Sequence, residues 1–171
     1  MKKKRTGIIG ILIAILVLGI GYAAVSYVTL TIEGTGAITS TQSNFVVVYT
    51  GVSLASKSSN DITTTQSASG TTGSFTVTGM TKKGDYAEFT YTIENQSEGL
   101  SAVLGNPVIA SGYNSEYFTV TSTTNSPTTL TSTGATNTTT QTVRIEAAKT
   151  PTADQTSNTV TITLQADPQP E

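Results

Sequence analysis

The chain has 171 residues, contains no His, Cys or Trp, and has only 12% charged residues. Without His or Cys it has no Ser-His-Asp or Cys-His nucleophile, no HExxH zinc site, no thiolate metal cage and no haem ligand pair. A carboxylate pair or a Ser-Lys dyad stays formally possible, but the eleven acidic residues are scattered. We therefore expect a protein that is not an enzyme and that holds neither a metal nor another cofactor.

The positive charge is concentrated at the N-terminus. Four of the nine basic residues form the run Lys2–Arg5, which leaves five basic and eleven acidic residues, a net charge of −6, for the rest. An acidic body of this kind argues against a nucleic-acid partner and against an anionic membrane surface.

Residues 1–23 have the three regions of a secretory signal peptide: the basic run, a long apolar stretch and a small-residue end. Gly21 and Ala23 place small residues at the −3 and −1 positions of a signal-peptidase site, so we expect cleavage before Ala24. This predicts a secreted protein that contacts the membrane only through its N-terminal segment, before processing by signal peptidase.

Two alternatives to cleavage remain open. No charged residue lies between Arg5 and Glu33, so the same segment fits an uncleaved transmembrane helix. A type IV pilin-like leader, cut after Gly7, would retain the hydrophobic helix in a filament. In that comparison Leu12 stands where bacterial pilins usually have glutamate, and the apolar run becomes strand-like by Val28.

Residues 24–36 read as an N-terminal strand followed by a flexible hinge. Val28, Leu30 and Ile32 alternate with polar residues, as in a strand with one apolar face, and Gly34 and Gly36 follow. These three apolar residues form a candidate donor strand, which fills a gap in the sheet of another subunit. The pattern fits equally well a first strand in the chain's own sheet.

From residue 37 to residue 166 the sequence predicts one all-β domain. Asp85–Glu94 alternates throughout and contains no Gly or Pro, so we expect it in the centre of a sheet, whereas the run Phe45–Tyr49 fits a strand buried on both faces. Seven to nine short strands with polar turns favour a single β-sandwich, jelly-roll or immunoglobulin-like. Residues 167–171 read as a polar tail.

Two Ser- and Thr-rich segments lack this clear alternation. Lys57–Gly73 reads as a mobile loop, while Thr121–Thr142 fits either a long connection or one edge strand around Thr128–Thr131.

Four tyrosines suggest a sugar-binding platform, although packing on strand faces explains them better: Tyr86, Tyr91, Tyr113 and Tyr117.

Two stretches resemble the TasA/camelysin family of exported bacterial biofilm-fibre proteins. The first is the signal-peptide end "GYAAVS" followed at once by "VTLTIEGTGAI" and "NFVVVYTGVS"; the second is "KKGDYAEFTYTIENQSEGLSAVL". The resemblance covers about a third of the chain. It implies a jelly-roll-like domain that is exported, processed by a dedicated signal peptidase and assembled into fibres through the freed N-terminal strand. A metallopeptidase activity, also ascribed to camelysins, does not carry over, because the chain has no His.

The expected function is therefore that of a structural subunit of an extracellular surface or biofilm-matrix filament. Subunits would self-assemble into a homopolymer by donor-strand exchange. A membrane-anchored adhesive or ligand-binding module is the alternative from another class.

Overall fold

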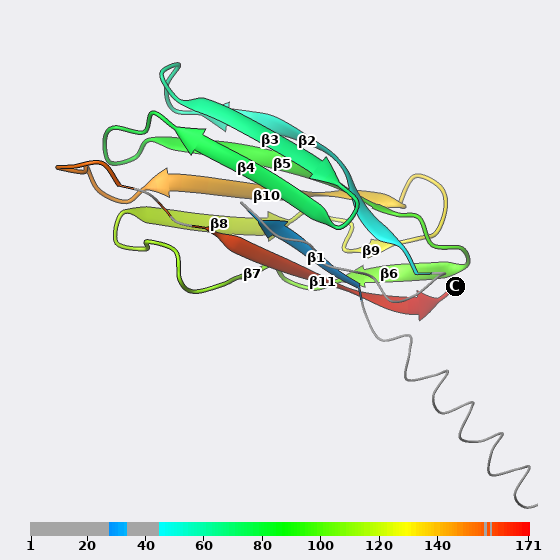
Figure 1. Cartoon of the computed structure of the whole chain (residues 1–171). Coiled ribbons are helices and arrows are strands. Elements are labelled where there is room, and N and C mark those ends of the chain that lie inside the picture. Colours follow the sequence, from blue (N-terminus) through cyan, green and yellow to red (C-terminus); the bar gives the residue numbers. More distant parts are fainter. Residues whose placement is uncertain (1–27, 34–44, 156, 158) are drawn as a thin grey trace, which may run out of the picture.

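The computed structural model describes residues 28–33, 45–155, 157 and 159–171, and for 28–33 the backbone alone. Every regular element in these ranges is a β-strand (Figure 1). The all-β prediction is thus confirmed, with no helix among the described residues. The N-terminal segment 1–23, with Gly21, Ala23 and Ala24, and the hinge at 34–36 lie outside them. No helix suited to crossing a membrane occurs in the described part of the chain.

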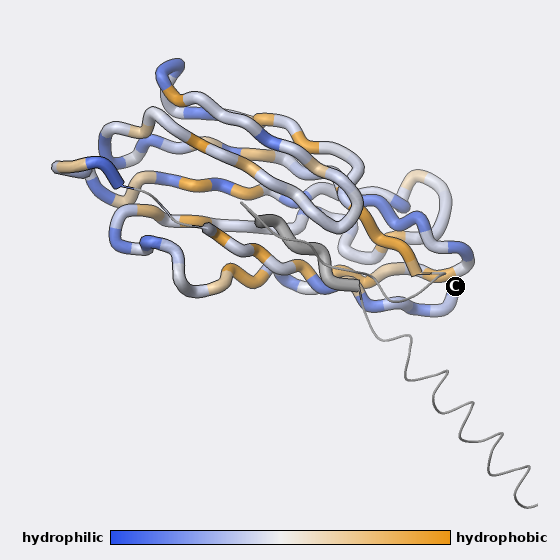
Figure 2. The backbone as a smooth tube through the Cα atoms, in the orientation of Figure 1, coloured by the Kyte–Doolittle hydropathy of each residue, from blue (hydrophilic) through white to orange (hydrophobic). Residues whose placement is uncertain are grey.

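The smaller sheet has four antiparallel strands in the order β2-β5-β10-β8. It consists of β2 (Val47–Lys57), β5 (Tyr86–Asn95), β10 (Thr138–Ala147) and β8 (Phe118–Thr124). β5 and β10 lie in the centre and bury every second residue, so the central position expected for Asp85–Glu94 is confirmed. Figure 2 shows the alternation as repeated changes between hydrophobic and hydrophilic colour along these strands.

The larger sheet has the order β3-β4-β1-β11-β6-β9, with β7 also paired to β11. Its strands are β1 (Val28–Glu33), β3 (Thr63–Ser69), β4 (Thr72–Thr78), β6 (Leu100–Leu104), β7 (Val108–Ile109), β9 (Thr129–Leu130) and β11 (Thr161–Pro170). β1 lies between β4 and β11 (Figure 1). The predicted strand around Val28, Leu30 and Ile32 therefore exists and occupies the chain's own sheet.

The buried faces of both sheets contribute to one hydrophobic core. Phe89 and Val143 come from the smaller sheet and Ile162 and Leu164 from the larger one, and all four side chains are fully buried. Burial of such apolar side chains, which stabilises by about 25 cal/mol per Å² of apolar surface, is the main force that holds the sheets together.

The prediction that Phe45–Tyr49 is buried on both faces was wrong. Phe45, Val47 and Tyr49 are buried, whereas Val46 and Val48 are only partly covered. The reason is that only one face of the smaller sheet meets the core, as the alternate burial along its central strands β5 and β10 also shows. β2 also has register shifts next to Tyr49 and Leu54, a common feature of edge strands.

The predicted mobile loop Lys57–Gly73 was also wrong, because most of it forms the β3–β4 hairpin. Seven residue pairs join the two strands, from Thr63 opposite Thr78 to Ser69 opposite Thr72. The inward positions of β3 carry Thr64, Gln66 and Ala68, so the apolar alternation that announces a strand is missing. β-branched Thr still favours the extended conformation.

Two further segments contain more strand than expected. Thr121–Thr142 holds the end of β8, the short β9 and the start of β10, which agrees with the edge-strand interpretation. In the expected polar tail, β11 continues to Pro170, with Pro168 opposite Ala102 of β6. A carboxylate then fixes the end of the chain, because Glu171 accepts hydrogen bonds from Ser101 and Ser132.

Candidate functional site

The candidate site is the place in the larger sheet that β1 occupies, which we call the β1 slot. It is bounded by β4 at Thr72 and Gly73 and by β11 at Thr161–Ala166. β1 is antiparallel to β11 over six residue pairs, from Val28 opposite Ala166 to Glu33 opposite Thr161. It is parallel to β4 at only two pairs, Thr31 with Thr72 and Ile32 with Gly73.

The larger sheet opens into a groove beyond the end of β1. β1 ends opposite Thr161, and the groove of about 1040 Å³ is lined by Thr159 and Val160, which directly precede that residue. Across from them it is lined by the second half of β4, including Phe75 and Val77. The groove therefore continues the line of the β1 slot between β4 and the start of β11.

A lysine that lines this groove forms an ion pair, so its positive charge is balanced by a neighbouring carboxylate. Lys149 pairs with Glu116, and its ammonium lies 4.3 Å from the centre of the Tyr117 ring. The hydrogen bond with Glu116 raises the pKa of Lys149. A lysine that remains fully protonated is not suited to act as a base or a nucleophile.

Tyr91 reaches from the smaller sheet to the wall of the β1 slot. Its ring is fully buried and its hydroxyl donates a hydrogen bond of 2.9 Å to the carbonyl of Ser74, the residue after Gly73. Burial raises the pKa of this hydroxyl above its ordinary value of 10.0, so it remains a protonated donor at neutral pH. Its role in the structure is to connect the two sheets beside the slot.

The four tyrosines considered for a sugar-binding platform do not form one. Tyr91 is buried, Tyr86 lies under Arg144, and Tyr117 lies beside Lys149. Tyr113 is partly buried against the hydrophobic core. Core packing, the interpretation we preferred, accounts for Tyr91 and Tyr113, whereas Tyr86 and Tyr117 pack against the cationic groups of Arg144 and Lys149.

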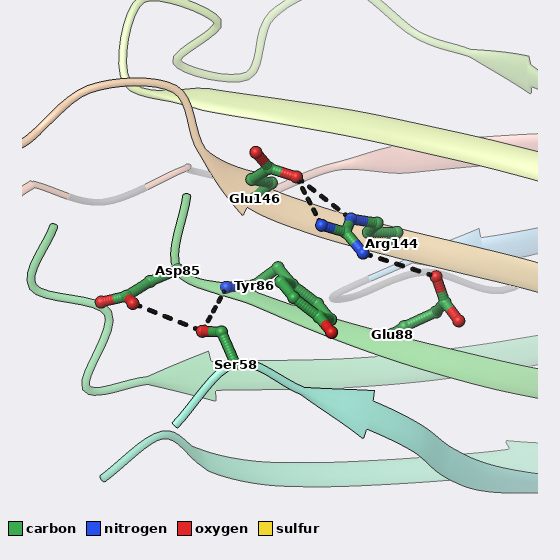
Figure 3. A network of polar contacts seen from close by, with 6 residues as sticks. All are labelled: Ser58, Asp85, Tyr86, Glu88, Arg144 and Glu146. Carbon is green, nitrogen blue, oxygen red and sulfur yellow. Dashed lines mark hydrogen bonds and ion pairs between the residues drawn. The ribbon is translucent and has the colours of Figure 1, made fainter. Parts of the chain in front are cut away.

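The Gly84-Asp85 turn before β5 is held by a buried carboxylate (Figure 3). Asp85 is only 3% exposed and accepts hydrogen bonds from the backbone amides of Thr81 and Lys82, at 2.8 and 3.1 Å, and from the Ser58 hydroxyl. The amide of Thr81 is the largest cause that lowers the pKa of Asp85 below its ordinary 3.8. The carboxylate is thus saturated by donors and serves as a structural cap.

The other end of β5 carries a second buried polar cap. Asn95 is 1% exposed, and its side-chain amide donates to the carbonyls of Leu100 and Leu130, in β6 and β9. Its side-chain oxygen accepts from the amide of Ser97. The sequence predicts the strand between Asp85 and Asn95 but not these two caps, because the alternation of a strand carries no information about the partners of the polar residues at its ends.

The most evident charged cluster lies on the outer face of β5 and β10 (Figure 3). Arg144 lies 3.5 Å above the centre of the Tyr86 ring, pairs with Glu146 at 2.7 Å and approaches Glu88 to 3.9 Å. The hydrogen bond with Glu146 raises the pKa of Arg144. Since two carboxylates surround this guanidinium, it is not free to bind an anionic ligand.

The described residues contain no group of three or more His, Cys, Asp or Glu side chains that could hold a metal ion. Comparison with the models of known protein families, with curated proteins and with solved structures finds no match.

Proposed function

We propose that this protein is an exported structural subunit of an extracellular surface or biofilm-matrix filament. In this proposal the subunits polymerise when β1 of one copy enters the β1 slot of the next. The supporting observation is the position of β1: it is the first described strand, only four residues separate it from the expected cleavage site, and it is nonetheless internal to a sheet.

The connectivity of β1 favours exchange. Its neighbours β4 and β11 begin at Thr72 and Thr161, so no hairpin joins β1 to either of them. β1 can therefore leave the larger sheet without displacing a strand to which a tight turn connects it. An identical strand from another copy then restores the same main-chain hydrogen bonds and covers edges that would otherwise aggregate.

The remaining parts of the proposal follow from the sequence. The two sheets with a shared core fit a jelly-roll or immunoglobulin-like β-sandwich, the architecture implied by the resemblance to the TasA/camelysin family. Signal peptidase removes residues 1–23, the freed N-terminus begins at Ala24, and the product is secreted to the cell surface or matrix. No catalytic step, metal or cofactor enters this function.

Deletion of residues 24–34 from the mature protein tests the proposal. We expect that fibres seen by electron microscopy disappear, because the deleted chain has no strand to donate. A matched pair of variants refines the test: V28T/L30T/I32T replaces the apolar alternate positions, and T29A/T31A replaces the intervening ones. The first should abolish fibres and the second should leave them. Undiminished fibres after the deletion would overturn the proposal.

The mass of the native N-terminus tests the processing step separately. Protein recovered from cells should begin at Ala24 and be found in high-molecular-weight assemblies. A chain that begins at Ile8 would indicate the pilin-like route, and an intact N-terminus would indicate a membrane-anchored module.

A further inference from the structure

The β4 wall of the β1 slot is attached to the rest of the molecule mainly through contacts other than β1. β4 shares seven residue pairs with β3 but only two with β1, and a turn at Gly70 and Thr71 joins the two strands of the hairpin. Loss of β1 would therefore remove the smaller share of the partners of β4.

Hydrogen bonds and ring stacking connect the β3–β4 hairpin to the smaller sheet. The Tyr91 hydroxyl donates to the Ser74 carbonyl at 2.9 Å, and the Phe75 ring stacks on Phe89 with 5.2 Å between their centres. At the hairpin turn, the backbone amide of Tyr49 donates to the carbonyl of Gly70 at 2.7 Å. Tyr91 and Phe89 belong to β5 and Tyr49 to β2, so none of these contacts depends on β1.

The opposite wall is also held independently of β1. On its far side β11 pairs with β7 at Ile162 and Thr163, and with β6 from Ala166 onward. Ile162 and Leu164 are fully buried in the core. Both edges of the slot thus have partners that stay in place when β1 leaves.

We propose that the β1 slot is preformed and that Tyr91 is the positioning residue for its β4 wall. When β1 opens, the β3–β4 hairpin stays docked on the smaller sheet, and the free edges of β4 and β11 keep the spacing that an incoming strand needs. This inference rests on the proposed function, because a preformed slot is useful only if strands are exchanged between subunits. Preorganisation of this kind lowers the ordering cost that the incoming strand would otherwise meet.

Hydrogen exchange of the chain from Ala24 onward, which keeps every described residue, tests this directly. In the wild type we expect the amides shared by β1 and β11 to exchange at least about tenfold faster than those shared by β3 and β4, because opening of β1 leaves the hairpin docked. Equal rates for the two sets would show that the hairpin melts together with β1, and would overturn the inference.

Two variants distinguish a positioning role of Tyr91 for the β3–β4 hairpin from a general effect on the stability of the fold. Y91F removes the hydroxyl that bonds to Ser74 but keeps the ring, whereas Y49F removes a comparably buried hydroxyl that bonds to Gln141 at 2.7 Å. Y91F should speed exchange in the β3–β4 hairpin by about tenfold, the equivalent of one buried hydrogen bond. Y49F should leave the ratio between hairpin and β1 unchanged. The same change in both variants would overturn the role of Tyr91.

The outcome is distinguishable from a failure of the proposed function, because the exchange rates are measured on monomeric protein. Independent exchange of the hairpin in a chain that forms no fibres would support a preformed slot and contradict the filament. Fibres from a chain whose hairpin melts with β1 would support the filament and contradict the preformed slot.

Discussion

Single polar residues determine how the strands of this protein end. Asp85 and Asn95 are both buried, and both satisfy their hydrogen-bonding groups with backbone partners at the two ends of β5. The sequence predicts the strand between them from its alternation, but it does not predict the caps. A cap depends on partners as distant as Ser58 and Leu130, and local patterning carries no information about them.

Replacement of Asp85 by Asn should destabilise the fold by about 1–3 kcal/mol. A neutral amide oxygen accepts more weakly than a carboxylate from the amides of Thr81 and Lys82, and the NH2 group can no longer accept from the Ser58 hydroxyl. Urea unfolding at neutral pH measures this. The exposed Asp61, which contacts only Ser59 through its side chain, is the matched control. D61N should stay within about 0.5 kcal/mol of the wild type; an equal loss in both variants would contradict the role of Asp85.

The same carboxylate should make the fold sensitive to acid. The native pKa of Asp85 lies below the ordinary 3.8, so the unfolded chain binds the proton more readily. The stabilisation is therefore complete above the ordinary pKa and is lost as the pH falls through the lower native value. In unfolding experiments between neutral pH and pH about 2, D85N should lose less stability on acidification than the wild type. Parallel curves would contradict this linkage.

Gly79 occupies a backbone position that excludes any other residue. Its φ is +84°, and an added Cβ would lie 2.4 Å from the carbonyl oxygen of Asp61. Gly79→Ala should therefore lower the free energy of unfolding by more than about 2 kcal/mol. Gly70, with φ +57° and nothing within 4 Å of an added Cβ, is the control. Gly70→Ala should cost only the strain of the left-handed backbone, about 1 kcal/mol.

Among the elements, apolar alternation separates strands that the sequence predicts from strands that it misses. β5 buries apolar residues from Ala87 to Ile93 at alternate positions and is predicted almost to the residue. β10 does so only from Val143 onward, because its first two buried positions carry Thr139 and Gln141. β3 places Thr64, Gln66 and Ala68 at its inward positions, so the hydropathy of its sequence does not alternate and does not predict a strand. β3 is a strand because it pairs with β4, and the residue pattern of β3 alone does not reveal this pairing.

The two faces of β11 should respond differently to mutation. Leu164 is fully buried, while the preceding Thr163 is only partly covered. Leu164→Ala should destabilise the fold by about 2–5 kcal/mol, because it leaves a cavity beside the β1 slot. Thr163→Ala should cost less than about 1 kcal/mol. Thermal unfolding of both variants checks this, and similar losses would contradict the assignment of the inner face.

At the scale of the whole molecule, the sequence predicts that β1 is a strand but not which strands it joins. Its pairing with β11 brings together residues more than a hundred positions apart, such as Thr31 and Thr163. Its parallel pairing with β4 cannot be derived from a turn, because no turn connects them. The order of the larger sheet depends on which edges remain free after the other strands have paired.

A cysteine pair placed across this junction would distinguish β1 in its own sheet from β1 in a neighbour. The chain contains no Cys, and the register places Thr31 opposite Thr163. Opposite residues of antiparallel strands have Cα atoms about 4.5–5.5 Å apart, within the range that a disulfide spans. T31C/T163C, oxidised as a monomer, should fail to form fibres until a reductant is added, because the disulfide locks β1 in its own slot.

If reduced subunits first assemble and are then oxidised, the same pair should join neighbouring subunits. Denaturing gels without reductant should then show a ladder of covalent multimers. T29C/T163C, which is two residues out of register, is the control and should give neither the lock nor the ladder. Assembled fibres that yield only intramolecular disulfides would mean that β1 stays in its own sheet, and another surface would then have to join the subunits.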